Sequence, residues 1–506
     1  MRVANKVAIN TVIQYTRLLL NFVISLYSVR VILNALGASD YGIYDVIAGV
    51  IAILGFLNSS LSQTSIRYLS VSLGKNNLAD LRNTFNNCFW LHLFIAIGIV
   101  AVLEFIGLFI FDGFLNIPKE RIEAARIVFH CMSVTMFLHI FITPFSAFII
   151  SHENFFYSSC ISILDALLKL GIAFFLAFTT GDKLVVYGIL MMTVVIINVV
   201  MYILYIFVKY KDEFYIGKPS FKGIKKQSKF AGWTIIDVLG TIANRQGYAI
   251  MLNKFFGPVT NAAFALARQI EGQIYTISAA VIDTIKPQIM KSYGSNDRER
   301  MFKLSMTAGK FGFILMSFIA IPLIVMMPLI LELWLKSVPE STVTFARLMV
   351  LACMSEQLTR GLVYACQAIG HIKWFSIIVS CIRVSALPIS VLLLSLGCSA
   401  YVAIIVFFIC EVTGSITRIF VISKLENISS LFFFQSVISR VLPSFVVAFL
   451  LCFTIHFFCK TLLTMIFNII ITSFSYLILI YLVGLSAEEK YAINNIIKSV
   501  FHRNER

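Results

Sequence analysis

One face of the first long apolar segment, Val7 to Leu36, carries side chains that could bind a polar ligand. Polar residues recur there at steps of three or four, which places them on one face of an α-helix: Asn10, Gln14, Arg17, Asn21, Ser25 and Ser28. Guanidinium groups bind phosphate bidentately and stay charged, whereas amides and hydroxyls suit sugars. A charge facing lipid is costly, so this face must contact protein or water. The segment is therefore more than an anchor.

Polar faces of the same kind recur on later apolar segments. Adding 220 to four positions of the first face gives Asp237, Thr241, Arg245 and Tyr248. Further faces consist of Ser158, Ser162, Asp165 and Lys169; of Arg268, Glu271, Tyr275 and Ser278; of Glu356, Arg360, Tyr364 and Gln367; and of Ser376, Ser380 and Arg383. Because such faces lie on corresponding helices of two halves, we predict a water-filled cavity between the halves.

This predicted cavity supplies two sets of candidate site residues. The substrate-binding set, for an anionic and hydroxyl-rich cargo, is Asn10, Gln14, Arg17, Asn21, Lys169, Arg245, Arg268, Arg360 and Arg383. The set for coupling to a Na⁺ or H⁺ gradient is Asp45, Asp165, Asp237 and Glu271. In the alternative interpretation these groups only pair and hold helices together, as the spacing of Arg268 with Glu271 and of Asp165 with Lys169 allows.

Signatures of enzymes and of bound cofactors are missing from the sequence. It contains no P-loop, no H-E-x-x-H and no G-x-S-x-G, and its seven histidines are scattered. The ten cysteines include no C-x-x-C pair and lie mostly in apolar runs, which is typical of small core residues. We therefore expect no enzymatic activity, no resident metal and no organic cofactor.

The composition is that of a polytopic helical membrane protein. Of 506 residues, 59% are hydrophobic and 13% are charged, and the mean hydropathy is +0.90. The net charge of +16 matches the excess of lysine and arginine on the cytoplasmic side of membrane proteins, which explains it better than nucleic-acid binding does.

Cutting the sequence at clusters of charged, Gly, Pro and Asn residues gives about 14 spans of about 20 residues or more. They are 9–33, 43–66, 87–111, 124–149, 156–178, 184–208, 231–253, 261–285, 304–330, 342–367, 374–396, 400–422, 439–459 and 462–484. The lysine-rich connections 209–229 and 286–303 fall on the same side as both ends of the chain. We therefore expect both termini to be cytoplasmic, in a bacterial inner membrane.

An internal repeat accompanies the recurring polar faces. At an offset of 220, the connection Gly37–Gly42 corresponds to Gly257–Ala262, and Gly74–Asp80 corresponds to Gly294–Arg300. This register indicates a duplicated six-helix unit with parallel copies, because an even number of spans returns the chain to the same side. The expected organisation is an N-terminal lobe 1–208, a basic linker 209–230, a C-terminal lobe 231–423, and two extra spans with an amphipathic tail, 424–506.

Two amphipathic segments complete the chain. Leu425 to Ser439 has exposed apolar residues unless it lies in the membrane interface. In the tail, Ser486 and Glu489 have the spacing of a capping box, and a line of apolar side chains follows. We expect both segments to lie on the cytoplasmic membrane surface.

The striped first helix, the element Leu36-Gly-Ala-Ser-Asp-Tyr-Gly-Ile-Tyr44, the connection Gly74-Lys-Asn-Asn-Leu and the layout of twice six plus two spans resemble a known family. They are similar to Wzx-type oligosaccharide flippases, polysaccharide biosynthesis proteins of the multidrug/oligosaccharidyl-lipid/polysaccharide exporter superfamily. The resemblance implies an all-α bundle of two lobes around a central cavity. It also implies transport of undecaprenyl-pyrophosphate-linked glycan repeat units, by alternating access, for O-antigen, capsule or exopolysaccharide assembly. Implied partners are the lipid-linked glycan, membrane lipid, and the polysaccharide polymerase and chain-length machinery.

Two alternatives to this function are kept open. Multidrug antiporters of the same superfamily typically use an acidic residue in the N-terminal lobe, often in the first helix, where this chain has Arg17 and no carboxylate. A Na⁺- or H⁺-coupled organic-cation antiporter is thereby disfavoured, although Asp45, Asp165 and Glu104 are available for coupling. The other alternative is a membrane-embedded glycan polymerase or transferase, which usually needs a large acidic loop outside the membrane. The longest connection here is basic.

Overall fold

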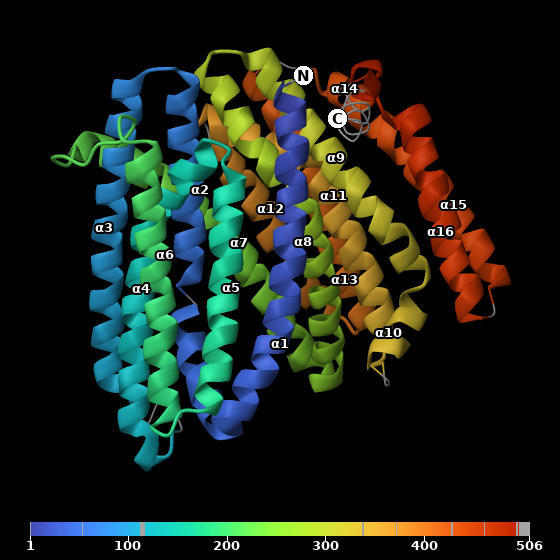
Figure 1. Ribbon diagram of the computed structural model, residues 1–506. Coiled ribbons are helices and arrows are strands. Elements are labelled where there is room, and N and C mark those ends of the chain that lie inside the picture. Colours follow the sequence, from blue (N-terminus) through green and yellow to red (C-terminus); the bar gives the residue numbers. More distant parts are fainter. Residues whose placement is uncertain are drawn as a thin grey trace, which may run out of the picture. The chain divides into compact units, whose positions relative to one another are not determined.

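The computed structural model describes residues 2–52, 54–111, 117–335, 338–370, 372–426, 429–459, 461–491 and 494. Within these residues, every regular element is a helix (Figure 1). Ten helical stretches in the described residues are long and apolar enough to cross a membrane, and each coincides with a predicted span. The prediction of an all-α polytopic membrane protein is confirmed.

The other four predicted spans also lie in helices. Span 43–66 is divided between α1 (Arg2–Ala52) and α2 (Gly55–Gly74), whereas 231–253, 261–285 and 342–367 are more polar than the ten. The three more polar spans carry polar faces that the sequence reveals. The polar residues that lower their hydropathy are therefore the candidate site residues themselves. A charged or amide-bearing helix is stable inside a membrane protein only where neighbouring helices cover its polar face.

The chain divides into two compact units. The N-unit comprises Asn10–Ile235 with Gly294–Asn296, and the C-unit comprises Met1–Ile9, Ile236–Tyr293 and Asp297–Arg506. Their boundary at residues 235 and 236 lies inside helix α7. The basic connection after residue 208 thus belongs to the N-unit, and the last two membrane helices belong to the C-unit.

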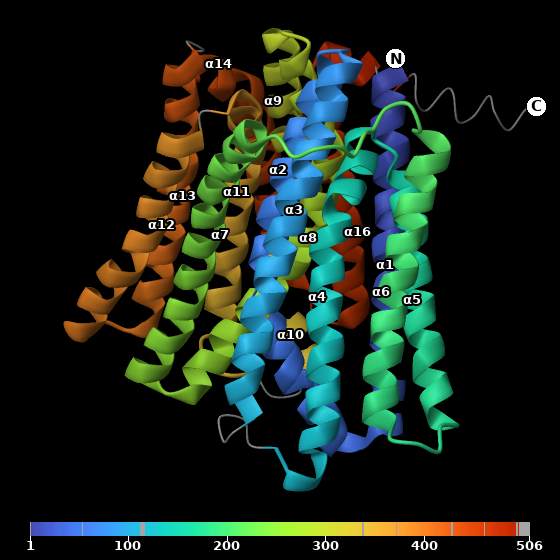
Figure 2. The ribbon, with the colours of Figure 1, turned by 90° about the vertical axis from the view of Figure 1, so that its left-hand side faces the viewer.

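The helices that precede α7 lie in the N-unit, apart from the first residues of α1, up to Ile9. They are α1 (Arg2–Ala52), α2 (Gly55–Gly74), α3 (Leu78–Phe109), the short 3₁₀ helix η2 (Lys119–Arg121), α4 (Ile122–Ser151), α5 (Phe155–Ala177) and α6 (Lys183–Lys209). Helix α4 packs against α2, α3 and α6, and α6 packs against α5 (Figure 2). The interior of this unit is therefore built around α4, whose buried residues include Phe129, Phe145 and Phe148.

The remaining helices form the C-unit, which α7 enters at Ile236. They are α7 (Phe221–Phe256), α8 (Pro258–Gly294), α9 (Arg298–Val325), α10 (Met327–Leu335), α11 (Thr342–Ile369), α12 (Ile372–Ser395), α13 (Ala400–Glu426), α14 (Ser430–Phe433), α15 (Ser439–Phe458) and α16 (Leu462–Leu479). Two short π-helical segments, Phe434–Ile438 and Ile480–Gly484, precede α15 and follow α16. Helix α11 packs between α9 and α13, and α15 packs on α9 and α16.

The predicted connection Gly37–Gly42 is a break at one residue rather than a loop. Gly37 has φ 78° and ψ 163° inside α1, and helical geometry resumes after it. In Figure 1 the chain turns at the lower end of this first helix. The repeat partner Gly257, where α7 gives way to α8, has φ 83°. Side chains with a Cβ avoid this region, so glycine at both positions allows a tight change of direction.

The second pair of repeat connections is also alike in backbone geometry. Asn76 and Asn296, 220 residues apart, both have positive φ, 53° and 61°. The following residues, Asn77 and Asp297, cap the next helix through a side-chain oxygen that accepts from the backbone N–H three residues on, at 3.1 and 3.0 Å. Such caps satisfy amides that have no partner inside the helix. These two connections of the predicted repeat thus share their backbone conformation and their helix caps.

Arg121 joins three helix ends of the N-unit. Its guanidinium lies 2.5 Å from Asp40 of α1 and 2.8 Å from Asp182, the N-cap residue of α6. Burial acts to raise the pKa of the Asp182 carboxyl, but hydrogen bonds from Arg121 and from the backbone at the start of α6 outweigh it, so this pKa lies below its usual range. Asp40 belongs to the element that carries the family resemblance, and its partner Arg121 comes from a distant part of the chain.

Close backbone contact holds α9 and α11 together in the C-unit. A Cβ on Gly361 would lie 1.8 Å from the carbonyl oxygen of Ser305, and a Cβ on Gly309 would lie 2.3 Å from that of Leu358. No larger residue fits at either position without moving a helix. Small residues at such crossings let membrane helices gain dispersion contacts where lipid supplies no hydrophobic driving force.

The two predicted amphipathic segments are described in part. Around α14, Leu431, Phe432 and Phe434 are exposed while Phe433 is buried, as expected for a helix with one apolar face in an interface. The capping box is present: Ser486 N–H donates to Glu489 at 2.7 Å, and Glu489 N–H donates to the Ser486 hydroxyl at 3.3 Å. Most of the tail that follows lies outside the described residues.

Candidate functional site

A polar layer crosses the interior of the N-unit between α1, α5 and α6. The Asn21 amide donates to the Ser162 hydroxyl at 2.8 Å, which connects the first helix to α5. The Lys169 ammonium lies 2.8 Å from Asp165, and the Asn198 amide of α6 donates to the same carboxylate at 2.7 Å. Asp165, predicted as a coupling residue, thus has both a charged and a neutral partner.

The other predicted N-unit residues are dispersed along α1. Asn10 is buried and donates to the carbonyl oxygen of Glu153 at 3.2 Å. Gln14 is buried, and among the described residues its side-chain oxygen has no hydrogen-bond partner. Arg17 is half-buried and close enough to Tyr202 to interact electrostatically. Asp45 is exposed on the part of α1 that follows the break, so the structure does not join it to the layer around Asp165.

Arg383 of α12 lies at the centre of a second layer, in the C-unit. Its side chain is buried, with 8% of its surface exposed. One terminal nitrogen donates to Glu356 of α11 at 3.0 Å and to Glu411 of α13 at 3.2 Å, and the other donates to the Thr241 hydroxyl of α7 at 3.4 Å. A single guanidinium therefore connects four helices. Figure 2 shows α7, α12 and α13 running side by side.

Glu356 accepts from a second arginine of its own helix. Arg360 donates to the same oxygen, Oε1, at 2.8 Å, and Arg418 of α13 approaches that oxygen to 3.8 Å. Three guanidiniums thus surround one buried carboxylate. Charges buried in this way are stable only where opposite charges beside them compensate for the lost hydration. We name the set Glu356, Arg360, Arg383, Glu411 and Arg418 the C-unit charge cluster.

Arg245 and Glu271 form a separate ion pair beside this cluster, at 2.9 Å. The other carboxylate oxygen of Glu271 is buried and has no hydrogen-bond partner in the described part of the chain. The pairing of Glu271 with Arg268 that helical spacing allows is not the one observed. Arg268 is half-buried with its guanidinium 5.9 Å from the centre of the Phe264 ring, and it forms no ion pair with a described carboxylate.

The remaining predicted C-unit residue, Asp237, accepts a long hydrogen bond of 3.4 Å from Ser380. Together with Asp237, Glu271 and Asp283, the C-unit layer offers five carboxylates. Against them stand the guanidiniums of Arg245, Arg268, Arg360, Arg383 and Arg418 and the ammonium of Lys286. One positive charge is therefore in excess among these described residues, and Arg268 is the guanidinium without a carboxylate partner.

Sequence reasoning missed two members of the cluster, Glu411 and Arg418. Both are buried in α13, within a span otherwise composed mostly of apolar residues. The signal was present, because two charges seven residues apart lie on the same face of a helix. Tyr364 and Asp283 form a further contact, a hydrogen bond of 2.9 Å between α11 and α8.

The side chains of these layers are of kinds that bind and orient a polar ligand. Among the described residues, no group of three His, Cys, Asp or Glu side chains is placed to hold a metal ion. Paired guanidiniums and carboxylates, amides and tyrosine hydroxyls are groups that recognise charge and hydroxyls reversibly.

Comparison with protein families gives a match at the sequence level. The family model described as polysaccharide biosynthesis protein matches residues 3–292, more than half of the chain. Comparison of the sequence with curated proteins gives no significant match.

Comparison with solved structures shows the fold. A MATE protein described in complex with MaD3S matches with a TM-score of 0.71 at 13% identity, over 83% of this chain and 96% of the other. A multidrug resistance MATE family transporter of the MOP superfamily, in an outward-facing conformation, matches with a TM-score of 0.68 at 14% identity and the same coverage. A MOP superfamily transporter from Pyrococcus furiosus, described as having a binding pocket of reverse polarity that suggests a different function, matches with a TM-score of 0.63 at 14% identity, over 82% of this chain and 95% of the other.

Proposed function

The chain belongs to the polysaccharide biosynthesis protein family, and from this premise we propose that it is a flippase for undecaprenyl-pyrophosphate-linked oligosaccharide repeat units. It moves them across the bacterial inner membrane by alternating access, and it supplies O-antigen, capsule or exopolysaccharide assembly. No bond is broken, so no catalytic residue is required. Both chain termini are cytoplasmic in this proposal, and the polysaccharide polymerase and chain-length machinery receive the product.

The observation that carries this proposal is the positive excess of the C-unit layer. Arg268 lies on a membrane helix without a carboxylate partner among the described residues, and Arg245 next to it keeps 35% of its side chain exposed although it is paired with Glu271. A guanidinium left without a counter-ion inside a membrane protein is costly unless an anion joins it. A pyrophosphate provides that anion, in a geometry that guanidinium groups bind well.

The polar layer of the N-unit supports the proposal that the substrate carries a glycan. Asn21, Ser162, Asn198 and Tyr202 present amides and hydroxyls, which donate and accept hydrogen bonds as sugar hydroxyls do. Arg17 and Lys169 add charge on the same helices. We propose that the sugars contact this layer while the polyprenyl tail stays in lipid.

Coupling to a Na⁺ or H⁺ gradient is part of the proposal. Asp165 and Glu271 are the carboxylates best placed for it, because each is embedded in a polar layer of its own unit. The Glu271 oxygen without a hydrogen-bond partner offers a position for a proton or a cation. Asp45 is exposed and Asp237 has only a long hydrogen bond, so both are weaker candidates.

The same free oxygen of Glu271 favours one alternative, an antiporter of organic cations. A buried carboxylate with a free oxygen attracts a cation, and structural neighbours include a protein described as a multidrug resistance transporter. The flippase accounts better for the excess of positive charge, which repels a cationic drug from this layer.

Deletion of the gene and complementation with variants tests the proposal. We expect the deletion strain to lose surface polysaccharide and to accumulate undecaprenyl-pyrophosphate-linked repeat units on the cytoplasmic face. Wild-type protein restores the polymer, whereas a variant with both Arg17→Ala and Arg268→Ala does not, at equal protein level. Arg30→Ala is the matched control, because Arg30 is exposed near the end of the first span.

Two outcomes would count against the flippase. Normal polysaccharide with the double variant would show that Arg17 and Arg268 do not bind the substrate. Normal polysaccharide in the deletion strain, together with new sensitivity to cationic dyes, would assign the protein to the antiporters.

A further inference from the structure

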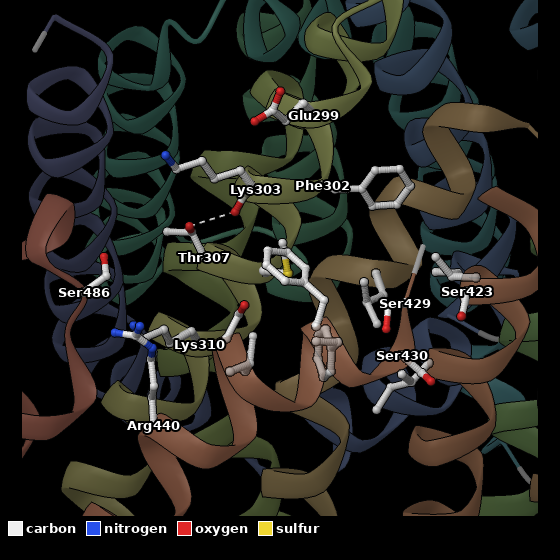
Figure 3. Close-up of a pocket in the computed structure, with 18 of the residues that line it drawn as sticks. Glu299, Phe302, Lys303, Thr307, Lys310, Ser423, Ser429, Ser430, Arg440 and Ser486 are labelled. Carbon is white, nitrogen blue, oxygen red and sulfur yellow. Dashed lines mark hydrogen bonds between the residues drawn. The ribbon is translucent and has the colours of Figure 1, made fainter. Parts of the chain in front are cut away.

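The C-unit contains a pocket that shares no lining residue with either polar layer. It has a volume of about 790 Å³ and is lined by α9, α13, the segment from Ser429 to Arg440, and residues 486–489 (Figure 3). That volume is in the range of sites that hold small molecules or lipid headgroups. None of the residues assigned to transport above lines it, so a ligand other than the transported substrate could occupy it.

The pocket opens at one end of the helix bundle of this unit. Arg298 is in the first turn of α9, Glu426 ends α13, Arg440 is in the first turn of α15, and Ser486 follows the π-helical segment after α16. Four membrane helices therefore begin or end around it, which places it at the level of the lipid headgroups. Phe432 of α14 also lines the pocket and is exposed, as an apolar side chain near lipid can be.

One side of the pocket is cationic. Lys303, Lys310 and Arg440 lie on this side with Ser486 (Figure 3). Lys310 is held by Glu489 at 2.5 Å, with only 3% of the lysine side chain exposed. Arg440 forms no ion pair with any described carboxylate. Three cations against Glu488 and Glu489 leave one positive charge on this side.

The ion pair between Lys303 and Glu488 is of a kind that a ligand can replace. Both side chains are largely exposed, 63% and 73%. Exposed ion pairs contribute only about 0–1 kcal/mol, so an incoming anion can take the place of Glu488 at little cost. A phosphate would then contact Arg440 and Lys303 from the same side, while the buried pair of Lys310 and Glu489 stays intact.

The opposite side of the pocket offers hydroxyls and the inner wall is apolar. Ser423, Ser429 and Ser430 lie across from the lysines in Figure 3. The apolar lining residues include Met306, Leu362, Ile419, Ile422 and Val437. Glu299 also lines the pocket, in the first turn of α9, and Figure 3 shows it at the far end of the view from Arg440.

We propose that this pocket binds an anionic phospholipid with a hydroxylated headgroup, of the phosphatidylglycerol type. The phosphate contacts Arg440 and Lys303, the headgroup hydroxyls contact the serines, and an acyl chain lies on the apolar wall. A guanidinium favours a phosphate over a neutral headgroup, and the apolar wall distinguishes a lipid from a free phosphate. Bound lipid connects α9, α13 and α15, so it stabilises the attachment of the last two membrane helices to the rest of the C-unit.

The test is lipid titration of the purified full-length protein, followed by native mass spectrometry. We expect saturable binding of phosphatidylglycerol and at least about tenfold weaker binding of phosphatidylcholine, and Arg440→Gln should weaken phosphatidylglycerol binding about tenfold. Lys424→Gln is the matched control: Lys424 is exposed in the last turn of α13 and does not line the pocket. If Arg440→Gln is poorly folded by size-exclusion chromatography, Lys303→Gln replaces it with the same expected direction.

Three results would overturn the proposal. Unchanged phosphatidylglycerol binding by the pocket variant would show that the lipid binds elsewhere. An equal loss in Lys424→Gln would show that the attraction is general surface charge. Competition by glycerol 3-phosphate at the concentrations at which the lipid binds would assign the pocket to a soluble phosphate. None of these results depends on the transported substrate, so the flippase proposal stands or fails separately.

Discussion

Replacing Arg383 by methionine is the sharpest test of the C-unit charge cluster. Methionine keeps much of the side-chain volume but removes the guanidinium that contacts both Glu356 and Glu411. Glu356 retains Arg360 at 2.8 Å, whereas Glu411 loses its ion-pair partner among the described residues while remaining 9% exposed. Breaking a buried pair from one side costs about 3–5 kcal/mol, because it leaves an uncompensated charge.

Thermal unfolding of the purified protein in one detergent and at one scan rate measures this effect. At about 1–2 °C per kcal/mol for a chain of 506 residues, the Tm of Arg383→Met should fall by roughly 3–10 °C. Adding Glu411→Leu removes the orphaned charge, so the double variant should recover at least half of that loss.

The reasoning would be refuted by either of two results. A wild-type Tm for Arg383→Met would mean that the cluster does not hold these helices together. A double variant whose Tm falls by the sum of the two single losses would mean that the two residues do not interact.

Further predictions concern packing and pH. Gly361→Leu should abolish accumulation of folded protein, measured by fluorescence-detected size-exclusion chromatography, because its Cβ would lie 1.8 Å from the Ser305 carbonyl oxygen; Gly272→Ala, with open space around it, is the control and should be stable. Asp182→Asn should lower the Tm by an amount corresponding to about 1 kcal/mol at neutral pH, because it weakens the cap of α6 and the contact with Arg121. Since folding lowers the pKa of Asp182, its contribution is full above the unfolded pKa and is lost as pH falls through the folded value, so the difference between wild type and Asp182→Asn should shrink below about pH 4. A difference that grows on acidification would contradict this sign.

Much of the fold follows from local sequence. Apolar runs of sufficient length give the membrane helices, since a backbone in lipid must satisfy its own hydrogen bonds. The repeat connections are equally local: Gly37 and Gly257 have positive φ, and Asn76 and Asn296 share a backbone conformation that Asn tolerates better than most residues. The sequence nevertheless predicts a connection over Gly37–Gly42 where the structure has a break at Gly37 alone, because local sequence does not show that helical geometry resumes immediately.

The partners of the charged residues do not follow from local sequence. Helical spacing allows Arg268 to pair with Glu271, but Arg245 of the neighbouring helix takes that carboxylate. Which pair forms depends on the rotation of α7 against α8, and that is set by packing over the whole unit. For the same reason, Glu411 becomes a partner of Arg383 only once α12 and α13 lie together.

The short-range pair of Glu356 and Arg360 has a consequence for how the chain is made. Helix α11 is not among the ten stretches apolar enough to cross a membrane by themselves, and it is synthesised before α12 and α13. A nascent chain ending near residue 369 therefore holds both charges before Arg383 and Glu411 exist. The pair within one helix, four residues apart, lets each charge neutralise the other during insertion. When Arg383 is later inserted, it pairs with Glu356, whose carboxylate is already neutralised by Arg360.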